Sequence, residues 1–213
     1  MSPAQGARLL ALLICCVSAE AASVEASVLS PAGAPVEDAA VVIEPVAGAH
    51  PKRQRTVTIE QRDRDFIPYV TVVQTGTLVE FPNRDPFKHH IYSFSPAKTF
   101  EIKLYADKPA LPILFDKAGE VAIGCNIHDW MEAYILVVNS AYFAKTGADG
   151  KAMIRDVPAG RYRLRVWHPR QKLEAPQREI EIGAGAASTK LSLVADVAAR
   201  TSKPKPAVES GKY

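Results

Sequence analysis

The most informative stretch of the sequence is Gly124-Cys125-Asn126-Ile127-His128-Asp129-Trp130-Met131. It holds a thiol, an imidazole and a thioether in one short segment, on Cys125, His128 and Met131, directly after the apolar run Val121-Ala122-Ile123. Soft and borderline donors of three kinds this close together indicate a metal site rather than a hydrophobic core. A fourth donor is available upstream, in the pair His89-His90, between a turn-rich segment and a strand-like run.

Two imidazoles and a thiolate in one plane, with a more distant thioether, form the ligand set of a blue-copper electron-transfer site. We therefore expect a copper ion that alternates between Cu(I) and Cu(II). The predicted ligands are His89, Cys125, His128 and Met131.

His90 is the alternative upstream ligand. Side chains alternate across a strand, so the two histidines face opposite sides and only one reaches the metal without a bulge. Choosing His89 sends Ile91 inward, with Ser93 on the same face, whereas choosing His90 would bury Tyr92 and Phe94 and more apolar area. We predict His89, in the register of the family resemblance described below.

The segment from Met1 to Ala21 has the features of a cleaved export signal. Arg8 precedes the apolar run Leu9–Val17, and Ala19-Glu20-Ala21 is a small-residue cleavage pattern. The apolar run is shorter than the ~20 residues that span a bilayer, so we expect a periplasmic protein without a membrane span. Cleavage would leave Cys125 as a lone thiol in an oxidising compartment, which metal ligation explains and a buried inert cysteine explains as the alternative.

Composition and pattern predict an all-β protein. The 213 residues include 16 prolines, and the apolar residues alternate in short segments without a long helical stripe. Expected strands include Phe66–Val72 and the continuous apolar run Tyr134–Val138, which fits a strand covered on both faces. A formal net charge of +3 is too small to favour nucleic acid or a membrane surface as a partner.

The central third resembles the cupredoxin family. Residues 76–85 run G-T-L-V-E-F-P-N-R-D before the histidine pair, and a C-x2-H-x2-M loop stands before a final strand, as in the short amicyanin-like loop. The longer sequence segments around both motifs resemble those of bacterial methylamine-utilisation and plastocyanin-like proteins. Two positions differ from the common pattern, because Gly124 replaces a common aromatic residue and His90 replaces the usual asparagine. The resemblance implies a Greek-key β-sandwich over residues 52–140 and an exposed His128 edge that conducts the electron. From their positions in the loop, Asn126 and Asp129 are the residues expected to support the ligands.

The flanking segments resemble a different family. Residues 33–41 and 149–169 resemble the opening and closing parts of the carboxypeptidase-regulatory-like, transthyretin-type β-sandwich. We expect residues 22–50 and 146–195 to form one split sandwich, with the cupredoxin unit inserted between its halves; two domains in tandem are the alternative. The tail, residues 198–213, is polar and rich in proline and lysine, and is expected to be disordered.

The expected function is a one-electron carrier and not an enzyme, with redox partners such as a c-type cytochrome or a dehydrogenase. A copper-handling protein without electron transfer would use the same donors, but the sequence has no further Met-rich stretch. Cys125 and His128 also permit a hydrolytic Cys-His pair, but no orienting acid is clearly placed. A β-sandwich adhesion or assembly module with a lapsed site is the remaining alternative, and a c-type haem is excluded because C-x-x-C-H is absent.

Overall fold

The computed structural model describes residues 21–48, 50–52, 55–109 and 111–201. These residues form strands without a helix, so the predicted all-β fold is confirmed and, in the part described, no helix could cross a membrane. The expected export signal, apart from Ala21, and the expected tail from residue 202 onward lie outside the described residues. The strands are β1 (Ala22–Leu29), β2 (Ala40–Pro45), β3 (Thr56–Thr58), β4 (Glu60–Arg62), β5 (Asp65–Ile67), β6 (Val70–Gln74), β7 (Thr77–Glu80), β8 (His89–Ser95), β9 (Lys98–Tyr105), β10 (Ile113–Phe115), β11 (Gly119–Gly124), β12 (Glu132–Val138), β13 (Tyr142–Lys145), β14 (Lys151–Val157), β15 (Gly160–Trp167), β16 (Arg178–Ile182) and β17 (Ser188–Val194).

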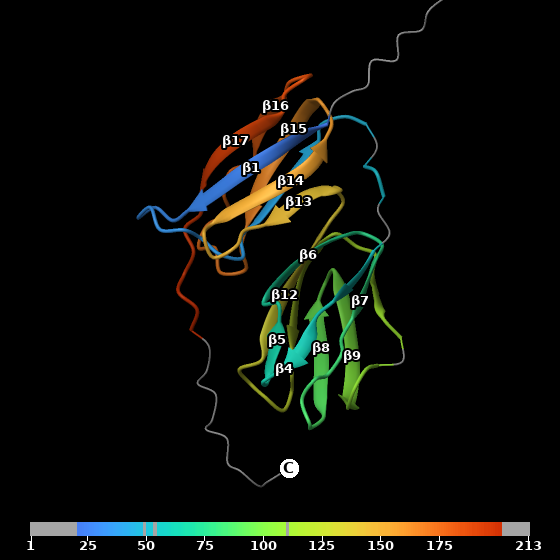
Figure 1. The fold of residues 1–213 in the computed structure, drawn as a ribbon. Helices are drawn as coiled ribbons and strands as arrows, with labels where there is room; N and C mark the ends of the chain where they lie inside the picture. Colours follow the sequence, from blue (N-terminus) through green and yellow to red (C-terminus); the bar gives the residue numbers. More distant parts are fainter. Residues whose placement is uncertain (1–20, 49, 53–54, 110, 202–213) are drawn as a thin grey trace, which may run out of the picture.

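Strands from the two ends of the chain form one pair of sheets, which we call the terminal unit (Figure 1). One sheet has the order β14-β1-β17 and the other β13-β2-β15-β16. β1 pairs in parallel with β17, from Ser23 opposite Ser188 to Leu29 opposite Val194. Alternate residues of β1 are buried, so its inward face contributes to a shared core that also holds Ile43 and Leu164. The domain boundaries expected from the sequence stay a prediction.

Strands β3 to β12 form the central unit, which carries the predicted ligands. Its largest sheet has the order β6-β12-β11-β8-β9, and a smaller sheet has the order β10-β7-β3. Phe81, Ile91 and Phe115 are fully buried in the core of this unit, together with the inward residues of β11 and β12. β8 and β11 therefore reach the same end of a packed core, and they deliver the histidine pair and the cysteine.

A third apolar cluster joins the two units. Leu136 and Val138 on β12 pack with Ala40 and Val42 of β2 and with Trp167 of β15. The indole Nε1–H of Trp167 also donates a hydrogen bond to Oε1 of Glu120, at 2.6 Å. Ile135 and Val137 face the central core, so β12 is covered on both faces. This confirms the prediction that its continuous apolar run forms a strand buried on both sides.

The expected single strand Phe66–Val72 is wrong in its boundaries. The chain forms β5 and β6 instead, and the break contains Pro68, which follows a cis peptide bond. A proline has no N–H to donate to a strand ladder, so it interrupts the pairing at this point. β13 and β14 were not expected as separate strands, because Tyr142–Lys145 is short and Lys151–Val157 contains three charged residues.

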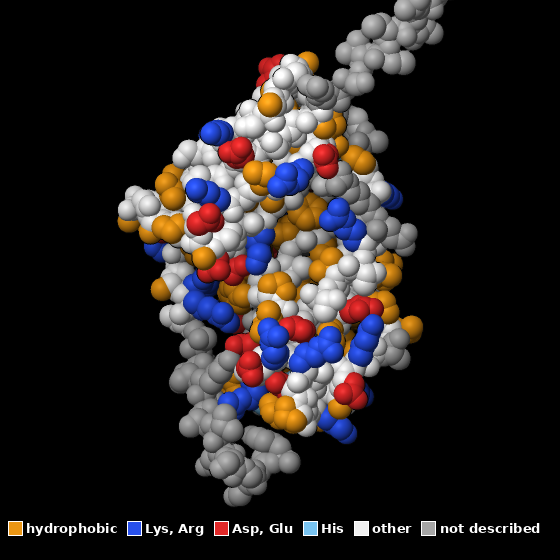
Figure 2. Space-filling model, viewed as in Figure 1, with side chains coloured by type: hydrophobic (Ala, Val, Ile, Leu, Met, Phe, Trp, Pro, Cys, Tyr) orange, Lys and Arg blue, Asp and Glu red, His pale blue; other side chains and the backbone are white. Residues whose placement is uncertain are grey.

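Basic and acidic side chains are interspersed on the face shown in Figure 2. Apolar side chains gather where the two units meet in that view. This mixture agrees with the small net charge of +3, and it gives this face no extended patch of one sign.

Candidate metal centre

Two core strands hold the loop that carries the thiol. β11 ends at Gly124 and β12 begins at Glu132, and these two residues face each other in the antiparallel ladder. Within the loop the Met131 amide donates to the His128 carbonyl at 2.9 Å, and the Cys125 amide donates to the Met131 carbonyl at 3.4 Å. A short loop closed by its own backbone and by a paired strand end places its side chains precisely enough for a metal site.

The upstream histidine enters from a turn that is fixed by Asn83. The Asn83 side-chain amide donates to the Phe87 carbonyl at 2.7 Å and to the Tyr105 carbonyl at 3.2 Å, while its oxygen accepts the Asp85 amide at 2.9 Å. Asn83 is 4% exposed, so these bonds are shielded from water. The turn delivers His89 as the first residue of β8.

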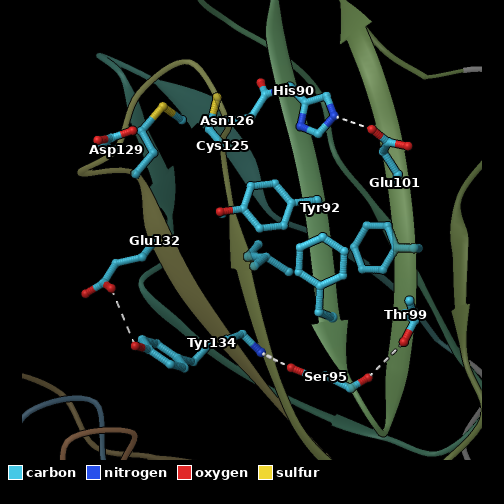
Figure 3. Close-up of a pocket in the computed structure, with 16 residues that line it drawn as sticks. His90, Tyr92, Ser95, Thr99, Glu101, Cys125, Asn126, Asp129, Glu132 and Tyr134 are labelled. Atoms are coloured by element: carbon cyan, nitrogen blue, oxygen red, sulfur yellow. Dashed lines mark hydrogen bonds and ion pairs between the residues drawn. The ribbon is translucent and has the colours of Figure 1, made fainter.

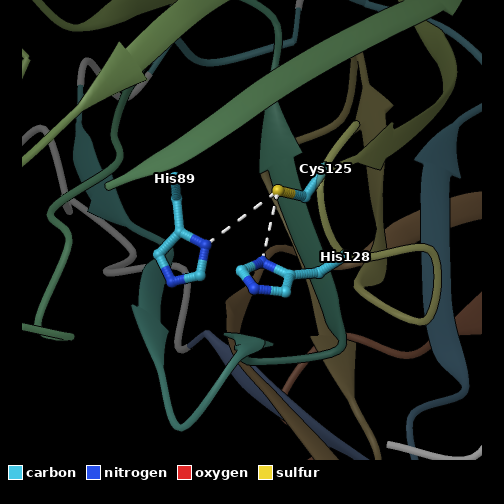
Figure 4. Close-up of side chains that lie close together, drawn as sticks. All are labelled: His89, Cys125 and His128. Carbon is cyan, nitrogen blue, oxygen red and sulfur yellow. Dashed lines mark hydrogen bonds between the residues drawn. The ribbon is translucent and has the colours of Figure 1, made fainter. Parts of the chain in front are cut away.

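Three donor atoms from these two segments meet in the core of the central unit (Figure 4). The Cys125 Sγ atom lies 3.9 Å from Nδ1 of His89 and 3.7 Å from Nδ1 of His128. All three atoms lie within 4.8 Å of one another. Met131 belongs to the same buried core and is 2% exposed.

His90 lies on the other face of β8. Its Nε2 atom is 2.9 Å from Oε1 of Glu101 on β9, and it lines an open groove of about 1040 Å³ on the outer face of the large sheet (Figure 3). Ile91 and Ser93 point inward on the side of His89, and Phe94 points outward with 80% of its surface exposed. The strand thus adopts the register in which His89, rather than His90, lies beside the cysteine.

The pKa shifts of two of the three side chains, Cys125 and His128, are in the direction that suits a metal site. Burial raises the pKa of the Cys125 thiol, but hydrogen bonds from the His89 ring and from the His90 and Ile127 amides outweigh burial and hold that pKa below its ordinary value. Burial also opposes a charge on His89, yet its contacts with Cys125 and Asp85 leave the pKa of His89 raised. Burial, together with the nearby charge of His89, lowers the pKa of His128. The lowered pKa values shift Cys125 toward the thiolate and His128 toward the neutral ring, which are the forms that bind metals, whereas the raised pKa of His89 shifts that ring toward its protonated form.

The spacing of the donor atoms fits a first-row metal ion. Metal–sulfur bonds of about 2.3 Å and metal–imidazole bonds of about 2.0 Å place the sulfur and nitrogen atoms about 3.7 Å apart in a trigonal arrangement. The measured separations of 3.7 Å and 3.9 Å agree with that figure. One thiolate and two imidazoles are the donors that favour copper among the first-row metals.

Aromatic rings cover the two histidines. The Phe87 ring lies 5.2 Å from that of His89 and 5.9 Å from that of His128, and the Trp130 ring lies 5.1 Å from that of His128. The expected exposed edge at His128 is therefore wrong, because this residue is only 4% exposed. The apolar residue that the loop presents to solvent is Ile127, which is 47% exposed.

The sequence did not identify Asp85 as part of the site. Its Oδ2 atom lies 2.7 Å from Nε2 of His89, and the two side chains are 7% and 0% exposed. The residues expected to support the site, Asn126 and Asp129, are exposed and line the groove of Figure 3. Asp85 and His89 are four residues apart, but that spacing predicts contact only in a helix. Because the sequence predicts strands and turns here, the spacing did not reveal the pair.

No protein-family model matches the sequence, and no curated protein matches it. Among solved structures, the chain is similar to a purple cupredoxin from Nitrosopumilus maritimus, with 19% identity over 38% of this chain and 99% of that one, at a TM-score of 0.35. An oxidized mutant of amicyanin is 15% identical over 38% of this chain and 81% of that one, at a TM-score of 0.36. A Cu-containing nitrite reductase from Thermus scotoductus is 26% identical over 53% of this chain and 28% of that one, at a TM-score of 0.37. These similarities cover part of the chain.

Proposed function

We propose that this chain is a periplasmic type 1 (blue) copper protein that carries single electrons. His89 and His128 would bind the ion through their Nδ1 atoms, with the thiolate of Cys125 and the thioether of Met131 as the other ligands. Bound copper would supply reversible one-electron chemistry between Cu(I) and Cu(II).

The supporting observation is a cluster of three buried donor atoms, from His89, Cys125 and His128, that lie within 4.8 Å of one another. Met131 lies in the same buried core. The four side chains, His89, Cys125, His128 and Met131, are between 0% and 4% exposed. They belong to one strand end and one short loop, both fixed by hydrogen bonds, so little rearrangement would be needed when the charge of the ion changes. Small rearrangement is what fast electron transfer requires.

Burial of the ligands also favours a carrier over an enzyme. A catalytic metal keeps a position open to substrate, whereas an electron crosses a thin covering of protein without direct access to the ion. That covering is apolar at the exposed Ile127 and the half-buried Phe87, whose ring contacts both histidines. We infer that partners such as a c-type cytochrome or a dehydrogenase dock over these two residues, since an apolar surface is readily desolvated.

The test is a copper titration of the chain followed by visible absorption and EPR. We expect one equivalent of Cu(II) to give intense thiolate-to-copper absorption and the narrow hyperfine splitting of a type 1 site, both reversed by reduction. Cys125→Ser should abolish the absorption and preserve the circular dichroism spectrum, because serine replaces the thiol with little change in volume.

Two outcomes would contradict the proposal. Tight Cu(I) binding without a coloured Cu(II) state would favour the alternative, a copper-handling protein without an electron-transfer role. Intense absorption that persists in Cys125→Ser would show that copper binds elsewhere on the chain.

A further inference from the structure

Asp85 contacts the side of His89 that faces away from the donor cluster. The carboxylate and the imidazole are both buried, at 7% and 0% exposed, and lie 2.7 Å apart. His89 thus uses its two ring nitrogens for different purposes, Nε2 toward Asp85 and Nδ1 toward Cys125.

The other contacts of Asp85 fix which partner holds the proton. Its Oδ1 atom accepts the amide of Asp63 at 2.8 Å, and its Oδ2 atom accepts the amide of Arg64 at 3.0 Å. An oxygen that already accepts an amide N–H is placed to accept again rather than to donate. The bond to His89 is therefore a donation from Nε2–H, which leaves the lone pair of Nδ1 directed at the metal position.

The same carboxylate links the two segments that carry the ligands. It holds the amides of Asp63 and Arg64, which form a tight turn with φ values of 55° and 57° between β4 and β5. The Arg64 carbonyl in turn accepts the indole N–H of Trp130 at 3.1 Å. Trp130 belongs to the loop of Cys125 and His128, so its position is tied to that of His89 through Asp85.

We propose that Asp85 is a positioning residue that fixes the Nε2–H form of His89 and lowers the reduction potential of the bound copper; this rests on the proposed copper function. A hydrogen bond from a ligating imidazole to a carboxylate increases the basicity of the ligand. A more basic ligand and a buried negative charge both stabilise Cu(II) more than Cu(I). Removing the charge therefore raises the potential.

The test compares Asp85→Asn with Glu101→Gln. Asparagine retains an oxygen acceptor of nearly the same shape and loses the charge. Glu101→Gln is the control, because it removes a carboxylate that contacts His90, the residue after His89. That carboxylate faces the groove and not the proposed ligands. We expect Asp85→Asn to weaken Cu(II) binding relative to Cu(I) by about 10-fold or more, which corresponds to a potential at least about 59 mV more positive. Glu101→Gln should leave the potential near that of the unmodified chain, and equal shifts in the two variants would overturn the proposal.

A second measurement needs neither copper nor a variant. Imidazole 15N NMR of the metal-free chain should show Nε2 of His89 protonated throughout the pH range in which the chain is folded. A neutral His89 with its proton on Nδ1 would overturn the positioning role even if Asp85→Asn fails to fold.

Zinc affinity, measured by calorimetry, should fall by about 10-fold in Asp85→Asn and not in Glu101→Gln. If the unmodified chain forms no type 1 centre, the copper function fails while the NMR and zinc results still decide the role of Asp85.

Discussion

His89 and His90 are consecutive residues whose rings lie on opposite faces of β8. Nδ1 of His89 is 3.9 Å from the Cys125 sulfur, whereas Nε2 of His90 is 2.9 Å from the Glu101 carboxylate. Both are buried, at 0% and 5% exposed, so burial alone does not distinguish them. The difference is the face of the strand that each one occupies, and it leads to the first prediction.

His89→Ala is expected to eliminate the type 1 absorption and EPR signals, because it removes one of the three strong donors. His90→Ala is the matched control, since it removes the same side chain one position further along the same strand. It should retain the signals after copper loading. Loss of the signals only in His90→Ala would show that β8 binds copper in the other register.

Stability should depend on pH through His168, which is 2% exposed. Burial, reinforced by the charge of Arg170, lowers the pKa of His168 to about 4 from an ordinary value of 6.5. The folded state therefore favours the neutral ring, and its contribution is fully present above about pH 6.5 and is lost as the pH falls toward 4. The loss amounts to about 3 kcal/mol of the free energy of unfolding.

His168→Asn tests this contribution. The Nδ1 atom of His168 accepts the Arg170 amide at 3.1 Å, and an asparagine oxygen can accept the same bond without gaining a proton. Urea denaturation at pH 7.5 and pH 4.5 should show a smaller loss of stability in the variant. Equal losses in the variant and the unmodified chain would mean that His168 does not titrate on unfolding.

Gly150 and Gly33 allow backbone strain to be separated from crowding. Both have a left-handed backbone, with φ of 71° and 81°. A Cβ atom at position 150 would meet the Val28 carbonyl oxygen at 2.7 Å, whereas one at position 33 would meet nothing within 4 Å. Gly33→Ala should therefore cost about 1 kcal/mol from the backbone conformation, and Gly150→Ala about 2–4 kcal/mol, because β1 must also move. Equilibrium urea denaturation measures both values, and similar losses would disprove the crowding.

Leu136 should contribute strongly to stability, because it is fully buried where the two units meet. Leu136→Ala is expected to lower the free energy of unfolding by about 2–5 kcal/mol. Leu104→Ala, at a residue that is 52% exposed, should change it by less than about 0.5 kcal/mol. Thermal denaturation of both variants checks the difference, and a small loss in Leu136→Ala would mean that the junction contributes little.

The local pattern of residues was enough to predict an all-β chain and a metal-binding loop. Alternating apolar residues predict strands because the side-chain period of a strand is two. The donors of Cys125, His128 and Met131 are close together in the sequence itself. The choice of His89 over His90 came from the family resemblance instead, because apolar burial by itself favoured His90.

Only the tertiary structure decided the contacts between segments that are distant in the sequence. Two contacts do not follow from local pattern, because each depends on how turns and strands pack. They are the contact of the Asp85 carboxylate with Nε2 of His89 and the hydrogen bond from Trp130 to the Arg64 carbonyl. The cover over His128 was mispredicted for the same reason: Phe87 reaches it from another turn. Periodicity shows which face of an element is buried, and packing decides which neighbour is opposite that face.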